Sequence, residues 1–149
     1  MQPADFDVAA LQRSLQPCSG ETGAVVAFTG YVRGANDAGT VQQMALEHYP
    51  SMTEKSILAI MEAADERWPL LRARVVHRIG RLNVGEQIVW VGVSSAHREA
   101  AFSACEYIMD YLKTRAPFWK KEIGPEGEVW VEALEKDEDR AERWEKGAT

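Results

Sequence analysis

We predict an α+β fold for this chain, with a mixed sheet, two main helices and an added antiparallel β hairpin region. Short stretches rich in small and β-branched residues occur in irregular order with two longer stretches whose apolar residues have helical spacing. The chain has 149 residues, of which 46% are hydrophobic and 27% charged, and this suits one globular domain. Because no repeat or long linker divides the sequence, we expect a single domain over residues 1–149, with a charged tail from about residue 135.

The first third of the chain predicts a short helix followed by two strands. Three apolar residues at helical spacing indicate the helix: Val8, Leu11 and Leu15. The strands are expected at residues 23–32 and 41–49. Residues 34–39 are rich in Gly, Asn and Asp, which tolerate turn geometry, so we expect a turn or mobile loop there.

The first main helix is predicted from a capping pattern and an apolar stripe. Ser51 followed by Glu54 fits a capping box. The stripe is formed by Ile57, Met61, Ala64 and Trp68. Pro69 is expected to end the helix.

The second half of the chain predicts two strands, a long helix and a hairpin. The strands are expected at residues 74–79 and 87–94 around a turn at 83–86. Ser94 or Ser95 is expected to cap a helix over residues 96–114, which Pro117 stops. Its apolar stripe consists of Phe102, Cys105, Ile108, Met109 and Leu112. A hairpin is expected at 118–123 and 128–134, and the charged tail is expected to be a solvated helix or a frayed end.

Composition excludes several classes of function. No apolar run approaches the roughly 20 residues of a membrane-spanning helix, and no signal-peptide pattern is present, so we expect a cytoplasmic protein and no membrane partner. The net charge of −6 argues against a nucleic-acid partner. Cys18 and Cys105 are far apart, and a disulfide between them is not expected in a reducing cytosol.

Positive charge nevertheless gathers in one segment. The segment 113–121 contains no acidic residue and four cations: Lys113, Arg115, Lys120 and Lys121. Such a local patch on an acidic protein indicates a focused anion site. Side chains alternate along a strand, so at most one of the adjacent Lys120 and Lys121 should enter a given pocket. A lysine whose pKa is lowered by burial can act as acid, base or nucleophile, but solvated lysines would give the same residue pattern.

Two further groups of cations could bind an anion such as a phosphate. His97 and Arg98 lie at the start of the long helix, where backbone N–H groups and the helix dipole favour anions and disfavour cations. Arg33 follows a strand and precedes the glycine-rich loop, a common place for a phosphate clamp. Simple exposure to water is the alternative for all three residues. No H-x-H, H-E-x-x-H or C-x-x-C spacing occurs, so we expect no metal and no cofactor, and Cys105 is interpreted as a core thiol.

Several segments closely resemble the large, catalytic subunit of molybdopterin synthase. They are residues 28–33 (FTGYVR), 46–50 (LEHYP), 52–55 (MTEK), 76–80 (VHRIG), 95–98 (SAHR) and 108–122 (IMDYLKTRAPFWKKE). The resemblance covers roughly residues 23–133, and its last segment is highly specific. It implies an α/β hammerhead fold and an enzyme that converts cyclic pyranopterin monophosphate into molybdopterin by forming a dithiolene.

The resemblance also implies partners and roles. The sulfur would come from a small ubiquitin-like sulfur-carrier subunit with a C-terminal Gly-Gly thiocarboxylate, and the large subunit would form a homodimer. Lys113 and Lys120 would be catalytic, with Lys120 activating the thiocarboxylate or the tetrahedral species formed from it. Substrate binding would involve Arg33, His97, Arg98, Lys113, Lys120 and Lys121.

The length of the long helix predicts a site that is shared between subunits. In a straight helix His97 and Lys113 would lie about 24 Å apart at 1.5 Å per residue, too far for one small pterin to contact both. We therefore expect His97 and Arg98 of one subunit to complete the lysine site of its neighbour. Two other classes remain open from the residues alone: an anion- or nucleotide-binding module without turnover, and a scaffold whose basic patch docks an acidic protein.

Overall fold

The computed structural model describes residues 1–16, 20–36, 39–131 and 135–145, and it confirms the α+β class. The elements in chain order are α1 (Val8–Ser14), β1 (Ala24–Tyr31), β2 (Ala35–Asn36), β3 (Gly39–Thr40), β4 (Gln43–His48), α2 (Met52–Arg67), β5 (Leu70–His77), β6 (Gly80–Asn83), β7 (Gln87–Ser95), α3 (Arg98–Thr114), β8 (Phe118–Gly124), β9 (Gly127–Val131) and α4 (Glu135–Glu145). Cys18 lies outside the described residues.

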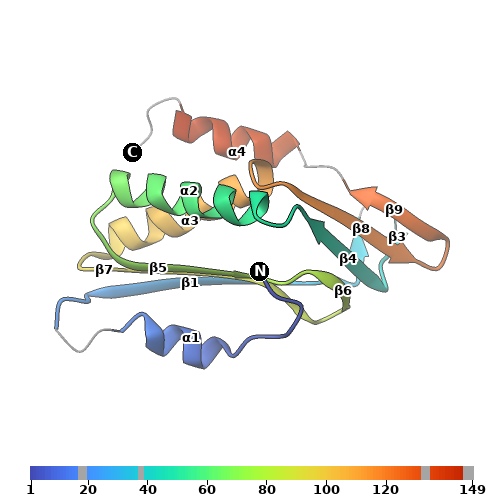
Figure 1. Cartoon of the computed structure of the whole chain (residues 1–149), viewed down its shortest axis with the longest axis horizontal. Coiled ribbons are helices and arrows are strands. Elements are labelled where there is room, and N and C mark those ends of the chain that lie inside the picture. Colours follow the sequence, from blue (N-terminus) through green and yellow to red (C-terminus); the bar gives the residue numbers. More distant parts are fainter. Residues whose placement is uncertain (17–19, 37–38, 132–134, 146–149) are drawn as a thin grey trace.

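The strands form a three-stranded sheet, a four-stranded sheet and a small two-stranded ribbon. The strand orders are β1-β7-β5, β6-β4-β8-β9 and β2-β3. All of these pairings are antiparallel, and the parallel contribution in the described chain is an isolated bridge between Gln2 and Arg78. In Figure 1, α2 and α3 cover one face of the three-stranded sheet, α1 covers the other, and α4 lies over α2 and α3. The four-stranded sheet extends from one end of this layered body (Figure 1).

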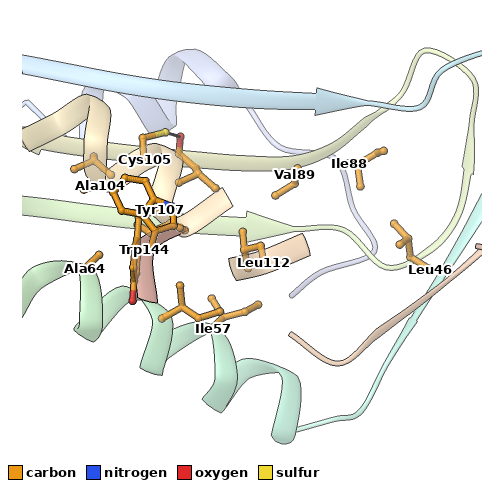
Figure 2. Packing of buried hydrophobic residues seen from close by; sticks show 14 of the residues in the cluster. Leu46, Ile57, Ala64, Ile88, Val89, Ala104, Cys105, Tyr107, Leu112 and Trp144 are labelled. Atoms are coloured by element: carbon orange, nitrogen blue, oxygen red, sulfur yellow. Dashed lines mark hydrogen bonds between the residues drawn. The ribbon is translucent and has the colours of Figure 1, made fainter. Parts of the chain in front are cut away.

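The main core lies between the three-stranded sheet and the helices α2 and α3. Strand β7 is buried along nearly its whole length because helices cover both faces of its sheet. Val91, Val93 and Ile108 are fully enclosed in this core, and Figure 2 shows several of its members, from Leu46 to Trp144. Burying such apolar side chains contributes roughly 1.5–3 kcal/mol each and holds the helices on the sheet.

A smaller core lies beneath α1. Asp7 caps this helix by accepting a hydrogen bond from the Ala10 backbone N–H at 3.2 Å. Leu11 and Leu15 then pack against the buried Trp90 of β7. Gly92 is required beside this indole, because a Cβ at that position would lie 2.1 Å from the Trp90 ring and 2.6 Å from Leu15.

The start of α2 differs from its prediction. Ser51 is the N-cap residue, as predicted, but it has a φ of 69° and makes no side-chain capping hydrogen bond, so the hydrogen bond expected of a capping box is not formed. The hydroxyl of Thr53 makes the local contacts instead, accepting a hydrogen bond from the Tyr49 N–H at 3.1 Å. The helix nevertheless ends before Pro69 as expected, and β5 begins at Leu70 rather than at residue 74.

The start of α3 also differs from its prediction. Ser94 and Ser95 both belong to β7, and the N-cap residue is His97, which makes no side-chain capping hydrogen bond. In the predicted stripe Cys105, Ile108 and Leu112 are buried, whereas Phe102 is 61% exposed. Phe102 lies at the outer edge of the stripe, on the side of α3 that faces β1.

Strand β6 was not predicted, and the segment expected to be a loop contains the short β2-β3 ribbon. The hairpin β8-β9 is confirmed over its described residues; positions 132–134 lie outside them.

The charged tail forms α4, as a packed helix rather than a solvated or frayed one, because Ala141 and Trp144 are buried. The Trp144 indole N–H donates to the buried carboxylate of Asp110 at 2.8 Å, which fixes α4 against α3.

Candidate active site

The fold brings Lys113 and Lys120 together. Lys113 lies in the last turn of α3, and Lys120 is the third residue of β8, so the short connection at residues 115–117 folds the strand back beside the helix end. Lys120 points to the same face of β8 as Phe118, toward the interior, and is partly buried. The two predicted catalytic lysines are therefore neighbours within one chain.

The surroundings of Lys120 change its acidity. Burial is the main cause that lowers its pKa from 10.5 to about 8, and the positive charge of Lys113 and a hydrogen bond with it act in the same direction. The carboxylates of Asp137 in α4 and Glu122 in β8 oppose this change. With a pKa of about 8, roughly a tenth of the Lys120 side chains are neutral amines at pH 7. Such an amine can accept or donate a proton near neutral pH.

A buried histidine lies near the lysine pair and was not predicted as part of the site. His77, the last residue of β5, is 6% exposed, and its ring stacks on Phe118 with centroids 4.1 Å apart and planes 21° apart. Burial is the main cause that lowers its pKa from 6.5 to about 4, helped by the charges of Lys120 and Lys113. His77 is therefore neutral at physiological pH and adds no third positive charge.

An open cavity of about 390 Å³ adjoins Lys113, between β1, α3 and α4. Its apolar lining includes Phe28, Phe102 and Met109. Its charged lining carries both signs: Glu106, Asp110, Lys113, Asp137 and Arg140. The exposure of Phe28 and Phe102, at 42% and 61%, follows from their position along this cavity. The site thus joins an apolar groove to a pair of lysines.

Lys121 points away from this site. Its ammonium forms an ion pair with Glu128 at 3.1 Å and lies 4.5 Å from the centroid of the Trp130 ring. Lys120 and Lys121 therefore divide between the two faces of β8, as the alternation of a strand predicts. The assignment of Lys121 to substrate binding stays a prediction.

Arg33 and the pair His97–Arg98 lie toward opposite ends of the three-stranded sheet. Arg33 follows the end of β1, whereas Gly23, just before β1, donates a backbone hydrogen bond to Ser95 close to the start of α3. Helix α3 lies along β1, so its Lys113 end lies toward the Arg33 end of that strand (Figure 1). All three residues are exposed, and none of them forms an ion pair within the described part of the chain.

His97 and Arg98 therefore do not meet Lys113 within one chain. They lie at the beginning of the 17-residue helix α3, and Lys113 lies at its end. A helix of this length spans about 25 Å. The predicted shared site between two subunits is consistent with this separation and stays a prediction.

Sequence reasoning missed His77, Asp137 and Arg140 as neighbours of the site. His77 belongs to the VHRIG segment, which could have served as the signal for it, whereas the two α4 residues come from a tail without a distinguishing motif.

Cys105 is a buried free thiol, as expected, and burial raises its pKa to about 12. Within the described ranges, no cluster of His, Cys, Asp and Glu suited to a metal is found, and no helix is long and apolar enough to cross a membrane.

Comparison with known proteins assigns the family. The sequence matches the MoaE protein family model over residues 1–115. The molybdopterin synthase catalytic subunit of Vibrio cholerae is 57% identical over 145 residues, which cover 97% of this chain and 96% of the relative. The structure of the molybdopterin biosynthesis MoaE protein from Burkholderia ambifaria has a TM-score of 0.82 and 46% identity, covering 97% of this chain and 95% of that one.

A more distant structure shares the fold. It is a protein-protein complex of subunits 1 and 2 of molybdopterin-converting factor from Helicobacter pylori, with a TM-score of 0.68 and 19% identity over 83% of this chain and 80% of that one. The family match over most of the chain, together with the high identity of the relatives, shows that the chain belongs to the MoaE protein family, the catalytic subunits of molybdopterin synthase in molybdenum cofactor biosynthesis.

Proposed function

We propose that Lys113 and Lys120 form the reaction centre in which sulfur passes from the thiocarboxylate of a small ubiquitin-like subunit to cyclic pyranopterin monophosphate, giving the dithiolene of molybdopterin. The observation that carries this proposal is the contact between the two lysines; burial, together with the charge of Lys113, lowers the pKa of Lys120 to about 8. Both reactants are anions, so two neighbouring cations suit their approach.

The two lysines have different tasks in this proposal. Lys120, partly buried, activates the thiocarboxylate or the tetrahedral species formed from it, because its amine changes protonation near neutral pH. Lys113, exposed at the helix end, holds or protonates the reacting groups. The cavity beside Lys113 has a largely apolar lining with Lys113 at its edge, which suits an extended chain end whose terminal group reaches the lysine.

The sulfur donor is a separate protein in this proposal. The described thiol of this chain, Cys105, is buried and has a pKa raised to about 12, so it does not suit a sulfur carrier. The Helicobacter pylori complex of two converting-factor subunits supports such a partner. The whole chain, residues 1–149, acts as one domain in the cytoplasm, where a free thiol also persists.

The phosphate of the substrate is bound by Arg33 and, from the neighbouring subunit of a homodimer, by His97 and Arg98. The exposed cations at the start of α3 support this arrangement, since a bound anion would offset their unfavourable position at the positive end of the helix dipole. The separation of the two ends of α3 supports the sharing of the site between two chains.

Incubation with a thiocarboxylated small subunit and cyclic pyranopterin monophosphate, followed by detection of the dithiolene product, tests the function. Lys113→Ala should lose product formation and still bind the small subunit. Loss of that binding would instead indicate a docking role, and pterin binding without any turnover would indicate a non-enzymatic anion-binding module.

Mixed dimers test the shared site. At a pterin concentration well below the KM of the variants, homodimers with His97→Ala and homodimers with Lys120→Ala are each expected to have little activity. A heterodimer of the two keeps one intact composite site and should recover part of the activity, whereas activity no higher than in either parent contradicts the sharing.

A further inference from the structure

The distance between Lys113 and Lys120 depends on a short segment that ends α3 and begins β8. After Lys113 the helix closes with the Arg115 N–H donating to the Tyr111 carbonyl at 2.7 Å. The Phe118 N–H then donates to the Ala116 carbonyl at 2.9 Å, which makes a tight turn into β8. The strand partners of β8 hold the backbone of Lys120 at Leu46 of β4 and Val131 of β9. The turn joins this strand directly to the end of α3, so its conformation sets how the strand approaches Lys113.

Thr53 holds this turn from the side of α2. Its side chain is completely buried, and its hydroxyl donates to the Pro117 carbonyl at 2.9 Å while accepting from the Tyr49 N–H at 3.1 Å. The Thr53 hydroxyl therefore acts as donor and acceptor at once, and it links the segment before α2 to the turn before β8. The neighbouring Ser51, which the sequence favoured as the cap, makes no such contact.

His77, at the end of β5, contacts the next residue of the turn. Its ring stacks on Phe118, at 4.1 Å between centroids. Its Nδ1 lies 2.8 Å from the Arg78 carbonyl oxygen, which can only accept, so Nδ1 carries the hydrogen and the ring orientation is fixed. The uncharged ring can therefore stay packed beside two cations.

We propose that Thr53 and His77 are positioning residues of the sulfur-transfer reaction, which together hold the Pro117–Phe118 step and so set the placement of Lys120 beside Lys113. This inference rests on the proposed function in one respect, namely that the two lysines serve sulfur transfer. The arrangement itself is a property of this chain and can be measured without turnover.

The pKa of the Lys120 side chain reports where that side chain lies. The charged or titratable groups that act on it are Lys113 of α3, Asp137 of α4 and Glu122 of its own strand, and His77 of β5 lies on the same side. Burial and Lys113 lower its pKa to about 8, so a displaced Lys120 would regain water, lose Lys113 and return toward 10.5. A merely structural role of Thr53 would lower stability without this change.

The Thr53 experiment compares three variants in the assembled synthase. Thr53→Val keeps the side-chain volume but removes both hydrogen bonds, and it should lower kcat roughly 10- to 100-fold with KM changed less than about twofold. Thr53→Ser keeps the hydroxyl and should restore most of the lost activity. Thr22→Val is the matched control, because the buried Thr22 hydroxyl has no hydrogen-bond partner among the described residues, and it should leave kcat unchanged.

The His77 experiment separates stacking from imidazole chemistry. His77→Phe preserves an aromatic ring against Phe118 and should keep most of the activity, whereas His77→Leu should lower kcat roughly as far as Thr53→Val does. If His77→Phe is as inactive as His77→Leu while remaining folded, the imidazole itself is required and the stacking role is overturned.

A titration of the Lys120 ammonium by NMR of 15N-labelled lysine side chains makes the test independent of activity. We expect a midpoint near the wild-type value for Thr53→Ser and Thr22→Val, and a midpoint at least about one unit higher for Thr53→Val. An unchanged midpoint in Thr53→Val overturns the positioning role. A wild-type enzyme that shows the low midpoint but no sulfur transfer would contradict the proposed function and leave the positioning result standing.

Discussion

The two ends of α3 differ in how firmly they are built. At its last turn, Lys113 meets Lys120 of β8, and the turn between them is fixed by α2 and β5. At its first turn, His97 and Arg98 are exposed, and the N-cap residue makes no side-chain hydrogen bond. In the proposed function the last turn belongs to the catalytic centre, and the first turn binds the phosphate of the substrate in a neighbouring subunit. Chemistry requires groups held in fixed positions, whereas a charged binding surface can remain open until its ligand binds.

The largest expected effect is a fall in kcat on substitution of Lys120, beside the last turn of α3. Lys120→Ala should lower kcat roughly 10²- to 10⁴-fold, the range typical of a lost proton-transfer group. Lys120→Arg keeps the charge but cannot supply a neutral amine, so it should remain nearly as inactive. The measurement is dithiolene formation under single-turnover conditions. Lys55→Ala, at an exposed position of α2, serves as the control, and an active Lys120→Arg would show that charge alone suffices.

The next effect concerns stability and the buried His77. Its pKa is about 4 in the folded chain, against 6.5 for a histidine exposed to water. The unfolded chain therefore binds a proton first as the pH falls, and stability should be lost progressively between pH 6.5 and 4, by about 3 kcal/mol in all. Urea unfolding at several pH values measures this slope. His77→Phe should flatten it, and an unchanged slope would place its origin elsewhere.

Removing the cations of the open end should affect binding more than chemistry. His97→Ala and Arg98→Ala each lose a charge-assisted contact with the substrate phosphate, which is worth about 1.5–3 kcal/mol, so KM should rise roughly 10- to 100-fold. The expected fall in kcat is smaller than that of Lys120→Ala. Steady-state kinetics with the pterin as the varied substrate checks this. A fall in kcat alone would show that the two ends do not divide the work in this way.

The smallest expected effect is a change in the stability of the unliganded protein on substitution of Arg98, in the first turn of α3. Arg98 occupies the first position of α3, where a cation opposes the helix dipole. Arg98→Gln should therefore raise the stability of the unliganded protein by about 0.3–1 kcal/mol, and added salt should reduce the gain. Thermal unfolding at low and high ionic strength provides the measurement. A loss of stability would mean that Arg98 has a structural role in the free chain.

Much of the fold could be predicted because its elements leave local patterns. The apolar spacing of α2 and α3 and the β-branched runs of β1 and β7 gave their type and approximate bounds. The helix starts were less predictable by residue type. Ser51 is the N-cap of α2 as predicted, whereas Ser94 and Ser95 pair within β7 and leave His97 as the N-cap of α3.

The candidate site could likewise be predicted only where its residues leave a local pattern. Lys113 and Lys120 belong to a highly specific segment, so the sequence singled them out as candidates. The alternation of side chains along a strand separated Lys120 from Lys121. The neighbours His77 and Asp137 come from β5 and α4, which are distant along the chain. The packing of α4 also depends on a contact between Asp110 and Trp144 that no local pattern indicates.

The sequence by itself determined the α+β class, the family resemblance, the cationic segment and the free core thiol Cys105. Only the tertiary structure decided that Lys120 has a lowered pKa, that a neutral His77 lies beside it and that the charged tail is a packed helix. The physical reason is one of range. Periodicity and turn preferences act between residues close in the chain, whereas desolvation and charge interactions depend on distances through space that exist only after the chain has folded.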